Sequence, residues 1–263
     1  RLPTRGGITA ADGGTITQTG MAGAAMCSPM GAQKSIVLLV NMPGTPTPAI
    51  TTDAVRDIFF ASTGRSLSEF WRENSYGQTW AEGDVKGWYT LDANYTCDQF
   101  TNIRDAAIRA ADRDVDFSQY RRVFIVISGI TGTCGWAGLS NVGCGSTIIT
   151  TEGTFTVSTA WMLSGYFSNR NDGVQISGHE GGHGLGLSHA SSRDFGTEPL
   201  GGLGVAGTVS EYGDYFSSMG FWNFGHYAAP HKVKLGWLTN YVTVNGNGSF
   251  AIQPMESLGG VQA

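Results

Sequence analysis

Five residues between positions 179 and 189 have the types and the spacing of a catalytic metal site. The segment reads HEGGHGLGLSH, so His179, Glu180, His183, Gly186 and His189 fill the fixed positions of the pattern H-E-x-x-H-x-x-G-x-x-H. Residues four apart share one face of a helix, and the first two histidines can therefore bind one ion. Three imidazoles leave a fourth position for water, which is the ligand set of a catalytic zinc site.

The other fixed positions have roles of their own. Glu180 directly follows the first histidine and is placed to accept a proton from a water in the open coordination position. Gly186 adopts a positive φ at low cost, so the helix can end there and the chain can turn sharply. This turn lets His189 approach the ion from outside the helix. The pattern predicts hydrolysis by a zinc-bound water, with Glu180 as the general base.

Four further glycines make this segment a poor helix on intrinsic propensity. Gly178, Gly181, Gly182 and Gly184 each cost about 1 kcal/mol relative to alanine. A core helix with two ordinary buried histidines would not need them. They predict that packing and the metal hold the helix, or that another group approaches its backbone closely.

A second segment, about thirty residues after the last histidine, supports the metal site. Residues 210–220 read SEYGDYFSSMG, in which Met219 lies in a candidate tight turn. A thioether packed beneath the imidazoles would form an apolar floor without binding the ion. The alternative is an ordinary core methionine, and the position after the zinc motif favours the supporting role.

Taken together, these segments resemble a known family. HEGGHGLGLSHA, followed by EYGDYFSSMG and APHKVKLGWL, resembles the metzincin metallopeptidases and, among them, the gametolysin family. The chain is more loosely similar to the immune inhibitor A-type peptidases. The earlier stretch SLSEFWRENSYGQTWAEGDVKGWYTL resembles the region before the zinc helix in both groups. The resemblance spans about residues 35–237.

The resemblance implies a role for each matching residue. It makes His179, His183 and His189 the zinc ligands, Glu180 the catalytic carboxylate and Met219 the supporting methionine of the Met-turn. Some metzincins have a tyrosine two residues after this methionine that also binds the metal. Phe221 occupies that position here, so no tyrosine ligand is expected from it.

The order of the other segments predicts a mixed α/β (α+β) fold. Apolar runs at 35–41 (SIVLLVN) and 122–128 (RVFIVIS) indicate buried strands, and further strands are expected at 79–91, 146–150 and 155–162. Helices are expected at about 53–61, 66–74, 98–112 and 230–235, besides the zinc helix, which Asn171 or Asp172 would cap. By the resemblance, this is a metzincin-like catalytic domain with a twisted mixed sheet, helices above it and an irregular lower subdomain below the active-site cleft.

We expect one metallopeptidase domain over residues 1–263. Its upper part would span about 1–186 and its lower part about 187–240. The run YVTVNGNGSFAIQ contains an Asn-Gly turn signal and predicts a C-terminal hairpin within about 241–263. The first 34 residues show little periodicity and would form strands or irregular cover at the edge.

Composition narrows the classes of partner. The net charge is −5 and only 14% of the residues are charged, with no basic patch for nucleic acid or anionic lipid. No apolar run reaches the roughly 20 residues of a membrane span. We expect a protein or peptide substrate, no nucleic-acid partner and a monomer. Low charge with 39 glycines, and a start at Arg1 without a signal peptide, favour the mature form of a secreted, extracellular protein.

The four cysteines predict two disulfides. Cys134 and Cys144 flank a glycine-rich stretch and can close a loop, which leaves Cys27 to pair with Cys97. Four free thiols remain an alternative. Cys27 alone can also be the thiolate that blocks the zinc in a retained pro-segment.

Several residues have weaker claims on the site. His226, His231, Tyr212 and Tyr215 can donate to the oxyanion, although core or surface roles are the simpler interpretation. Calcium ligands can be among four carboxylates, those of Asp194, Glu198, Glu211 and Asp214. The simpler interpretation is that these residues lie in a solvated acidic loop. Phe155–Met162 is the candidate edge strand for substrate pairing. Phe221–Tyr227 would line the pocket past the scissile bond and favour apolar side chains.

Three other functions compete with a zinc endopeptidase. A catalytically inactive metzincin fold could serve as a binding module, but the intact Glu180 argues against it. A zinc amidohydrolase acting on a non-protein substrate shares the chemistry and is separated only by substrate profiling. A purely structural zinc would show no activity.

Overall fold

A mixed sheet at one end of the molecule carries most of the ordered structure. The computed structural model describes residues 27–202, 204–243 and 249–256. The sheet is formed by β1 (Gly31–Asn41), β2 (Thr79–Thr90), β3 (Arg122–Ser128), β4 (Gly138–Ser140), β5 (Ser146–Thr150) and β6 (Gly153–Leu163). Its order is β2-β1-β3-β6-β4, and β5 also pairs with β6. Strands β2, β1, β3 and β6 are parallel, whereas β4 and β5 run antiparallel to β6. The predicted mixed α/β fold is confirmed.

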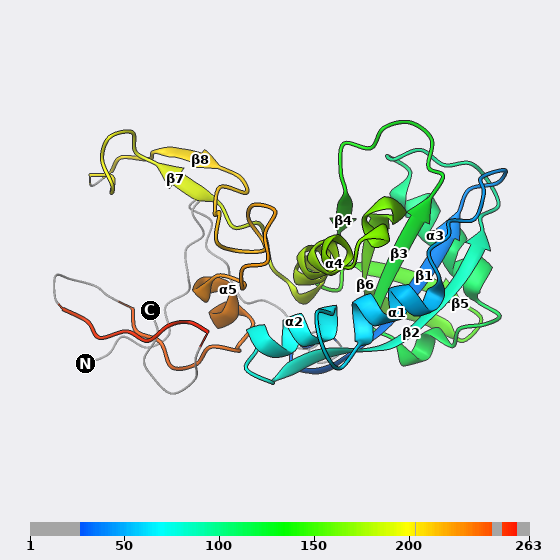
Figure 1. Cartoon of the computed structure of the whole chain (residues 1–263), viewed down its shortest axis with the longest axis horizontal. Coiled ribbons are helices and arrows are strands. Elements are labelled where there is room, and N and C mark those ends of the chain that lie inside the picture. The colour runs from blue at the N-terminus through cyan, green and yellow to red at the C-terminus, as the bar shows by residue number, and fades with distance from the viewer. Residues whose placement is uncertain (1–26, 203, 244–248, 257–263) are drawn as a thin grey trace.

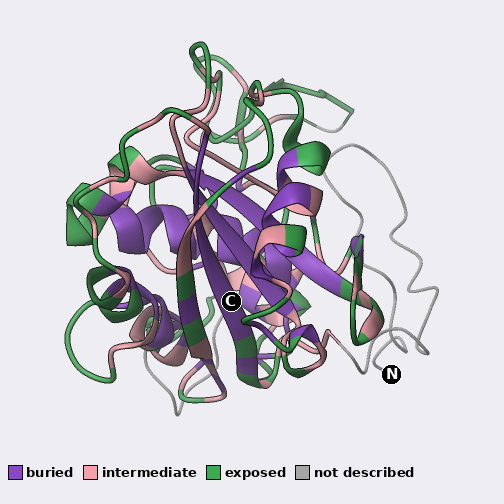
Figure 2. Cartoon of the chain, turned by 90° about the vertical axis from the view of Figure 1, so that its right-hand side faces the viewer, coloured by how far each residue is buried: buried purple, intermediate pink, exposed green. Residues whose placement is uncertain are grey.

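Helices cover both faces of this sheet. They are α1 (Thr52–Phe60), α2 (Leu67–Asn74), α3 (Phe100–Ala111), α4 (Arg170–Leu185) and α5 (Ala229–Lys234), with 3-10 turns η1 (Phe117–Gln119) and η2 (Ser164–Ser168). Val37 and Leu39 of β1 pack with α1, α2 and α4, while Ile36, Leu38 and Val40 pack with α3 on the other face. A strand buried on both faces reads as a continuous apolar run, and Figure 2 shows the sheet buried between its helices.

The chain leaves the sheet through α4 and continues into a region with little regular structure. Helix α4 lies between the sheet and this lower region, which contains α5 and the short hairpin of β7 (Ser192–Asp194) and β8 (Thr208–Ser210) (Figure 1). The turn of the predicted C-terminal hairpin, 244–248, lies outside the described residues, as do residues 1–26. No strand is formed by the described neighbours 241–243 and 249–256. Among the described helices, none is long and apolar enough to cross a bilayer.

Two expectations about the strands and helices were wrong in detail. Phe155–Met162 is not an exposed edge, because β6 pairs with β3 on one side and with β4 and β5 on the other. The glycine-rich segment after β3 returns to β6 and supplies the outer strand β4. Helix α4 begins at Arg170, and its cap is Asn169, whose side chain accepts a hydrogen bond from the backbone N–H of Asn171.

Two disulfides form as predicted, but with a different pairing. The bonds join Cys27 to Cys144 and Cys97 to Cys134. The loop after β2 and the loop after β3 lie side by side, because Thr96 and Thr131 form a parallel bridge. Parallel crossovers thus bring together residues that sequence spacing keeps apart. Since Cys27 is bonded to Cys144, it is not a free thiolate that could block a metal.

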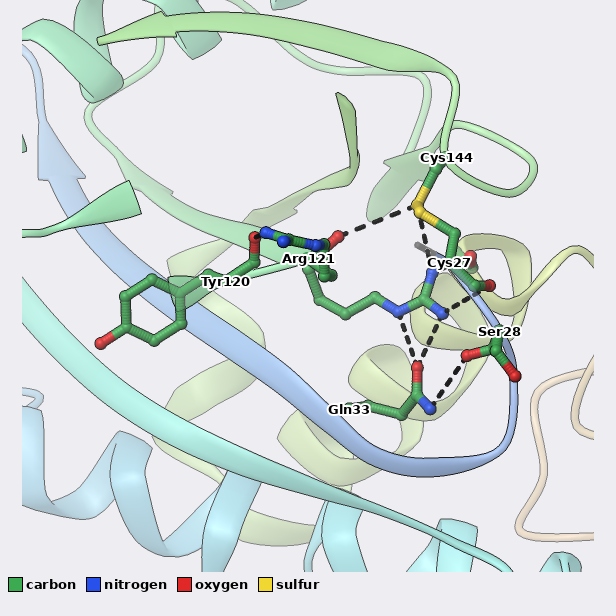
Figure 3. The surroundings of a disulfide bond; sticks show 8 residues. Cys27, Ser28, Gln33, Tyr120, Arg121 and Cys144 are labelled. Atoms are coloured by element: carbon green, nitrogen blue, oxygen red, sulfur yellow. Dashed lines mark hydrogen bonds between the residues drawn. A yellow bond between two sulfur atoms is a disulfide. The ribbon is translucent and has the colours of Figure 1, made fainter. Parts of the chain in front are cut away.

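A buried arginine links the Cys27–Cys144 disulfide to the end of α4. Arg122 is 1% exposed, and its guanidinium donates to Gln33 Oε1 at 2.7 and 3.1 Å and to the carbonyl of Gly184. Its Nη1 also lies 3.8 Å from Cys144 Sγ, and Figure 3 shows Gln33 near the Cys27–Cys144 disulfide. Burial lowers the pKa of Arg122 to about 10, so the side chain stays charged. A cation at the last carbonyls of a helix is stabilised by the helix dipole, and this contact holds the end of α4.

Candidate metal centre

Helix α4 is held by close packing against its glycines. A Cβ at Gly181 would overlap the ring of Trp71, and one at Gly182 would overlap the Sδ of Met219. A Cβ at Gly178 would press on Phe70. The prediction that other groups approach the helix backbone closely is therefore confirmed.

The helix ends where the motif predicts. Gly186 adopts φ 112° and ψ 14°, and its N–H donates to the carbonyls of Gly182 and His183. Leu187 N–H also donates to Gly182 O at 3.0 Å, which closes the last turn. The chain then reverses and carries His189 back to the helix.

The structure brings the three predicted ligands together. One ring nitrogen from each of His179, His183 and His189 lies within 4.8 Å of the others. The Nε2 atoms of His183 and His189 are 3.1 Å apart. Among the described residues, no other group of three or more His, Cys, Asp or Glu side chains is arranged in this way. The four acidic residues weighed as calcium ligands thus form no such cluster.

The hydrogen bonds of the rings test whether this cluster fits a metal. Nδ1 of His179 lies 2.8 Å from the carbonyl of Ser218, and Nδ1 of His183 lies 2.8 Å from the carbonyl of Leu187. A carbonyl only accepts, so each of these Nδ1 atoms carries the proton and each Nε2 presents a lone pair.

Nδ1 of His189 is held by a carboxylate, Glu211 Oε1, at 2.6 Å. The same reasoning leaves its Nε2 as a lone pair, facing that of His183 at 3.1 Å. Two lone pairs at this distance repel unless a cation lies between them. Three imidazole nitrogens with oriented second nitrogens suit a borderline divalent ion such as zinc.

Glu180 lies beside this cluster in an apolar setting. Its side chain is buried, and Oε2 has no hydrogen-bond partner among the described residues. A Cβ at Gly138 of β4 would overlap its carboxylate, so a side chain at this position would displace the carboxylate. Burial raises the pKa of Glu180 to about 8, close to the range in which a general base works best near neutral pH.

Met219 and Tyr227 support the helix from the lower region. Met219 is fully buried, and its carbonyl accepts from Ala190 N–H at 2.8 Å, which ties the Met-turn to the loop after the third histidine. The phenol of Tyr227 donates to Gly178 O at 2.6 Å and accepts from Trp71 Nε1 at 3.0 Å. The sequence predicts Tyr227 only as part of a pocket wall.

A cleft of about 450 Å³ opens in front of the cluster. Its lining comes from the β4 segment, α4 and the Met-turn, namely Gly135, Trp136, Ala137, Gly138, Gln175, Ile176, His179, Glu180, Tyr212, Ser218, Gly220, Phe221 and Trp222. Of the predicted wall 221–227, Phe221 and Trp222 line the cleft. Trp136 is partly buried against the hydrophobic core and also lines the cleft.

The other candidate donors occupy different places. Tyr212 lines the cleft, and its ring centroid is 3.8 Å from that of His189. Tyr215 is 67% exposed and is not among the residues that line the cleft. His226 lies between Glu73 Oε1, at 3.2 Å, and the buried Lys232 Nζ, at 2.9 Å. Its imidazole therefore belongs to a separate polar network.

His231 on α5 should make stability depend on pH. Burial, with a smaller contribution from Lys234, lowers its pKa to about 4, below the ordinary value of about 6.5. The neutral His231 therefore makes its full contribution to the stability of the fold above about pH 6.5, and this contribution is lost as the pH falls toward 4. We expect the free energy of unfolding of His231→Asn to fall by about 2 kcal/mol less than that of the parent chain between pH 7 and pH 5. Urea unfolding of both metal-free proteins checks this, since the site histidines are common to both; equal losses would contradict it.

Comparison with known proteins agrees with the site. A search of curated proteins finds no match. The family model for gametolysin peptidase M11 matches residues 33–261, a span that includes the sheet, α4, the histidine cluster and the Met-turn. The chain therefore belongs to the gametolysin family of metallopeptidases.

Proposed function

We propose that the chain is an extracellular zinc-dependent endopeptidase with one catalytic ion. The observation that carries the proposal is the convergence of three oriented imidazoles beside a buried, unpartnered Glu180 in an open cleft. Two disulfides support an oxidising compartment. The ion would be held by His179, His183 and His189, and Met219 would pack beneath their imidazoles.

The ion and the residues of the cleft would have separate roles in the reaction. When bound, zinc lowers the pKa of a water and polarises the scissile carbonyl. Glu180 accepts the proton of the attacking water and delivers it to the leaving nitrogen. Its apolar surroundings keep the proton affinity high enough for this return step. Gly138 packs against the carboxylate and restricts its rotation.

A substrate chain would pair with β4 rather than with β6. Strand β4 is terminal in the sheet, and its residue Gly138 lies against Glu180. An extended peptide added to this edge is recognised through its main chain, which suits cleavage within many sequences. Phe221 and Trp222 also line the cleft and would favour an apolar side chain next to the scissile bond.

Of the candidate oxyanion donors, Tyr212 is the one that lines the cleft among the described residues. Its phenol stays protonated at neutral pH, because burial raises the pKa of Tyr212 further. Tyr212→Phe removes the hydroxyl and keeps the ring against His189, so kcat should fall about 10²-fold or more. Zinc content should not change. Steady-state kinetics with a quenched peptide, beside metal analysis, decides this; an unchanged kcat would remove Tyr212 from the reaction.

A substrate panel tests the proposed activity against its rivals. Zinc-loaded protein is offered casein, quenched peptides, and amides of sugars and small acids. Cleavage within casein and the peptides supports an endopeptidase. Cleavage of the non-protein amides alone would indicate an amidohydrolase, and binding of peptides without turnover would indicate a binding module.

A further inference from the structure

The third histidine is held differently from the other two. Nδ1 of His179 and His183 contacts backbone carbonyls, whereas Nδ1 of His189 contacts the carboxylate of Glu211 at 2.6 Å. A backbone carbonyl carries a partial charge, and a carboxylate carries a full one. Glu211 therefore acts on one ligand of the cluster alone.

The β7–β8 hairpin brings this carboxylate to the ligand. β7 starts three residues after His189, and β8 ends directly before Glu211. Ser192 and Ser210 are paired across the two strands. The ligand and its carboxylate thus lie at the same end of one antiparallel ladder, although 22 residues separate them in sequence.

Tyr212, the residue after Glu211, packs against the face of the same imidazole. The rings of Tyr212 and His189 have centroids 3.8 Å apart and an interplanar angle of 38°. Tyr212 has φ 60°, a left-handed conformation that is strained for a bulky side chain and persists only where its surroundings enforce it. Behind it, Gly213 leaves no room for a Cβ against Ser192. The backbone is therefore bent so that Glu211 contacts the edge of the His189 ring and Tyr212 packs on its face.

We propose that Glu211 is a positioning residue for the third metal ligand, and that the β7–β8 hairpin serves to deliver it. The inference rests on the proposed zinc site. A carboxylate on the second nitrogen of a ligating histidine fixes its tautomer, orients the ring and raises its basicity. The side chain of Glu211 is 68% exposed, so without a metal this pair contributes little to stability. Its effect is on the affinity for the ion.

This arrangement couples the ion to the hairpin. An ion on His189 favours the ring position that Glu211 contacts, and that contact closes the ladder between β7 and β8. The coupling is reciprocal. Ion binding should therefore protect the hairpin amides from exchange, and loss of the carboxylate should remove part of that protection.

Zinc affinity gives the first test. The zinc dissociation constant is measured by competition with a chromophoric chelator for the parent chain, Glu211→Ala, Glu211→Gln and Glu198→Ala. Glu198 is an exposed carboxylate of the same hairpin loop and serves as the matched control. We expect Glu211→Ala to bind zinc about 10–100-fold more weakly, Glu211→Gln to fall between it and the parent, and Glu198→Ala to match the parent. Glu211→Ala within twofold of the parent would overturn the inference.

Two further readouts separate positioning from folding. Thermal melts of the zinc-free proteins should coincide, and hydrogen exchange should show zinc-dependent protection at 192–194 and 208–210 in the parent but less in Glu211→Ala at saturating zinc. If the zinc-free Glu211→Ala is itself destabilised enough to account for its lost affinity, the role is structural and the inference fails. If the parent chain binds no zinc, the proposed function fails first.

Discussion

Glutamine in place of Glu180 is expected to lower kcat/KM for a quenched peptide by about 10²–10⁴-fold, because it removes the general base. Zinc should remain bound, since the three histidines that hold it are unchanged. The amide is close in size to the carboxylate and fits the space left by Gly138. Peptide cleavage and metal analysis on one preparation measure both outcomes.

Glu198→Gln makes the same change at an exposed position and should leave the rate unaltered. If Glu180→Gln cleaves as fast as the parent chain, the activity comes from another residue or from a contaminant. If it also loses zinc, the carboxylate acts on the metal and not on the proton.

Alanine in place of His183 is expected to abolish both zinc binding and cleavage. The side chain is 7% exposed, and its Nδ1 contacts Leu187 O at 2.8 Å, so its loss also loosens the turn that returns His189. The affinity should fall by more than the about 10–100-fold that loss of an outer partner costs. Chelator competition and peptide cleavage check this.

Each of these two substitutions serves as the experimental control for the other. His183→Ala should lose metal and activity together, whereas Glu180→Gln should lose activity alone. A His183→Ala protein that still binds one equivalent of zinc tightly and cleaves peptide would show that the ion lies elsewhere.

The candidate site was largely predictable because its chemistry is local in the chain. The spacing of His179, Glu180 and His183 needs only helix geometry, and the return of His189 needs only the positive φ that Gly186 adopts. The glycines of α4 correctly indicated close packing, although their partners Phe70 and Trp71 could not be named from sequence.

Apart from the cap of α4, which is local, the misses depend on contacts between distant segments. Strand β4 is three residues long and lies in a glycine-rich stretch without alternation, so the sequence does not indicate it as the outer strand and favours β6 as the edge instead. The Cys97–Cys134 disulfide lies beside a bridge between Thr96 and Thr131, which sequence spacing does not reveal.

The partner of the third ligand was missed for the same reason. The sequence indicates Glu211 only as one of four acidic residues with the chemistry of calcium ligands, and its contact with His189 exists only because the β7–β8 hairpin closes. A carboxylate beside an exposed tyrosine, shortly before the Met-turn, was the available signal. Tyr227 was similarly placed in a wall, whereas its hydroxyl supports α4 through Gly178.

The most direct measurement is a titration of chelator-treated protein with zinc while quenched-peptide cleavage is followed. Cleavage should be absent without zinc, rise in proportion to the zinc added and stop rising at one equivalent per chain. This is the behaviour of a single catalytic ion on His179, His183 and His189. Cleavage that persists in the zinc-free protein, or that stays absent at one bound equivalent, would contradict the assignment of a zinc endopeptidase.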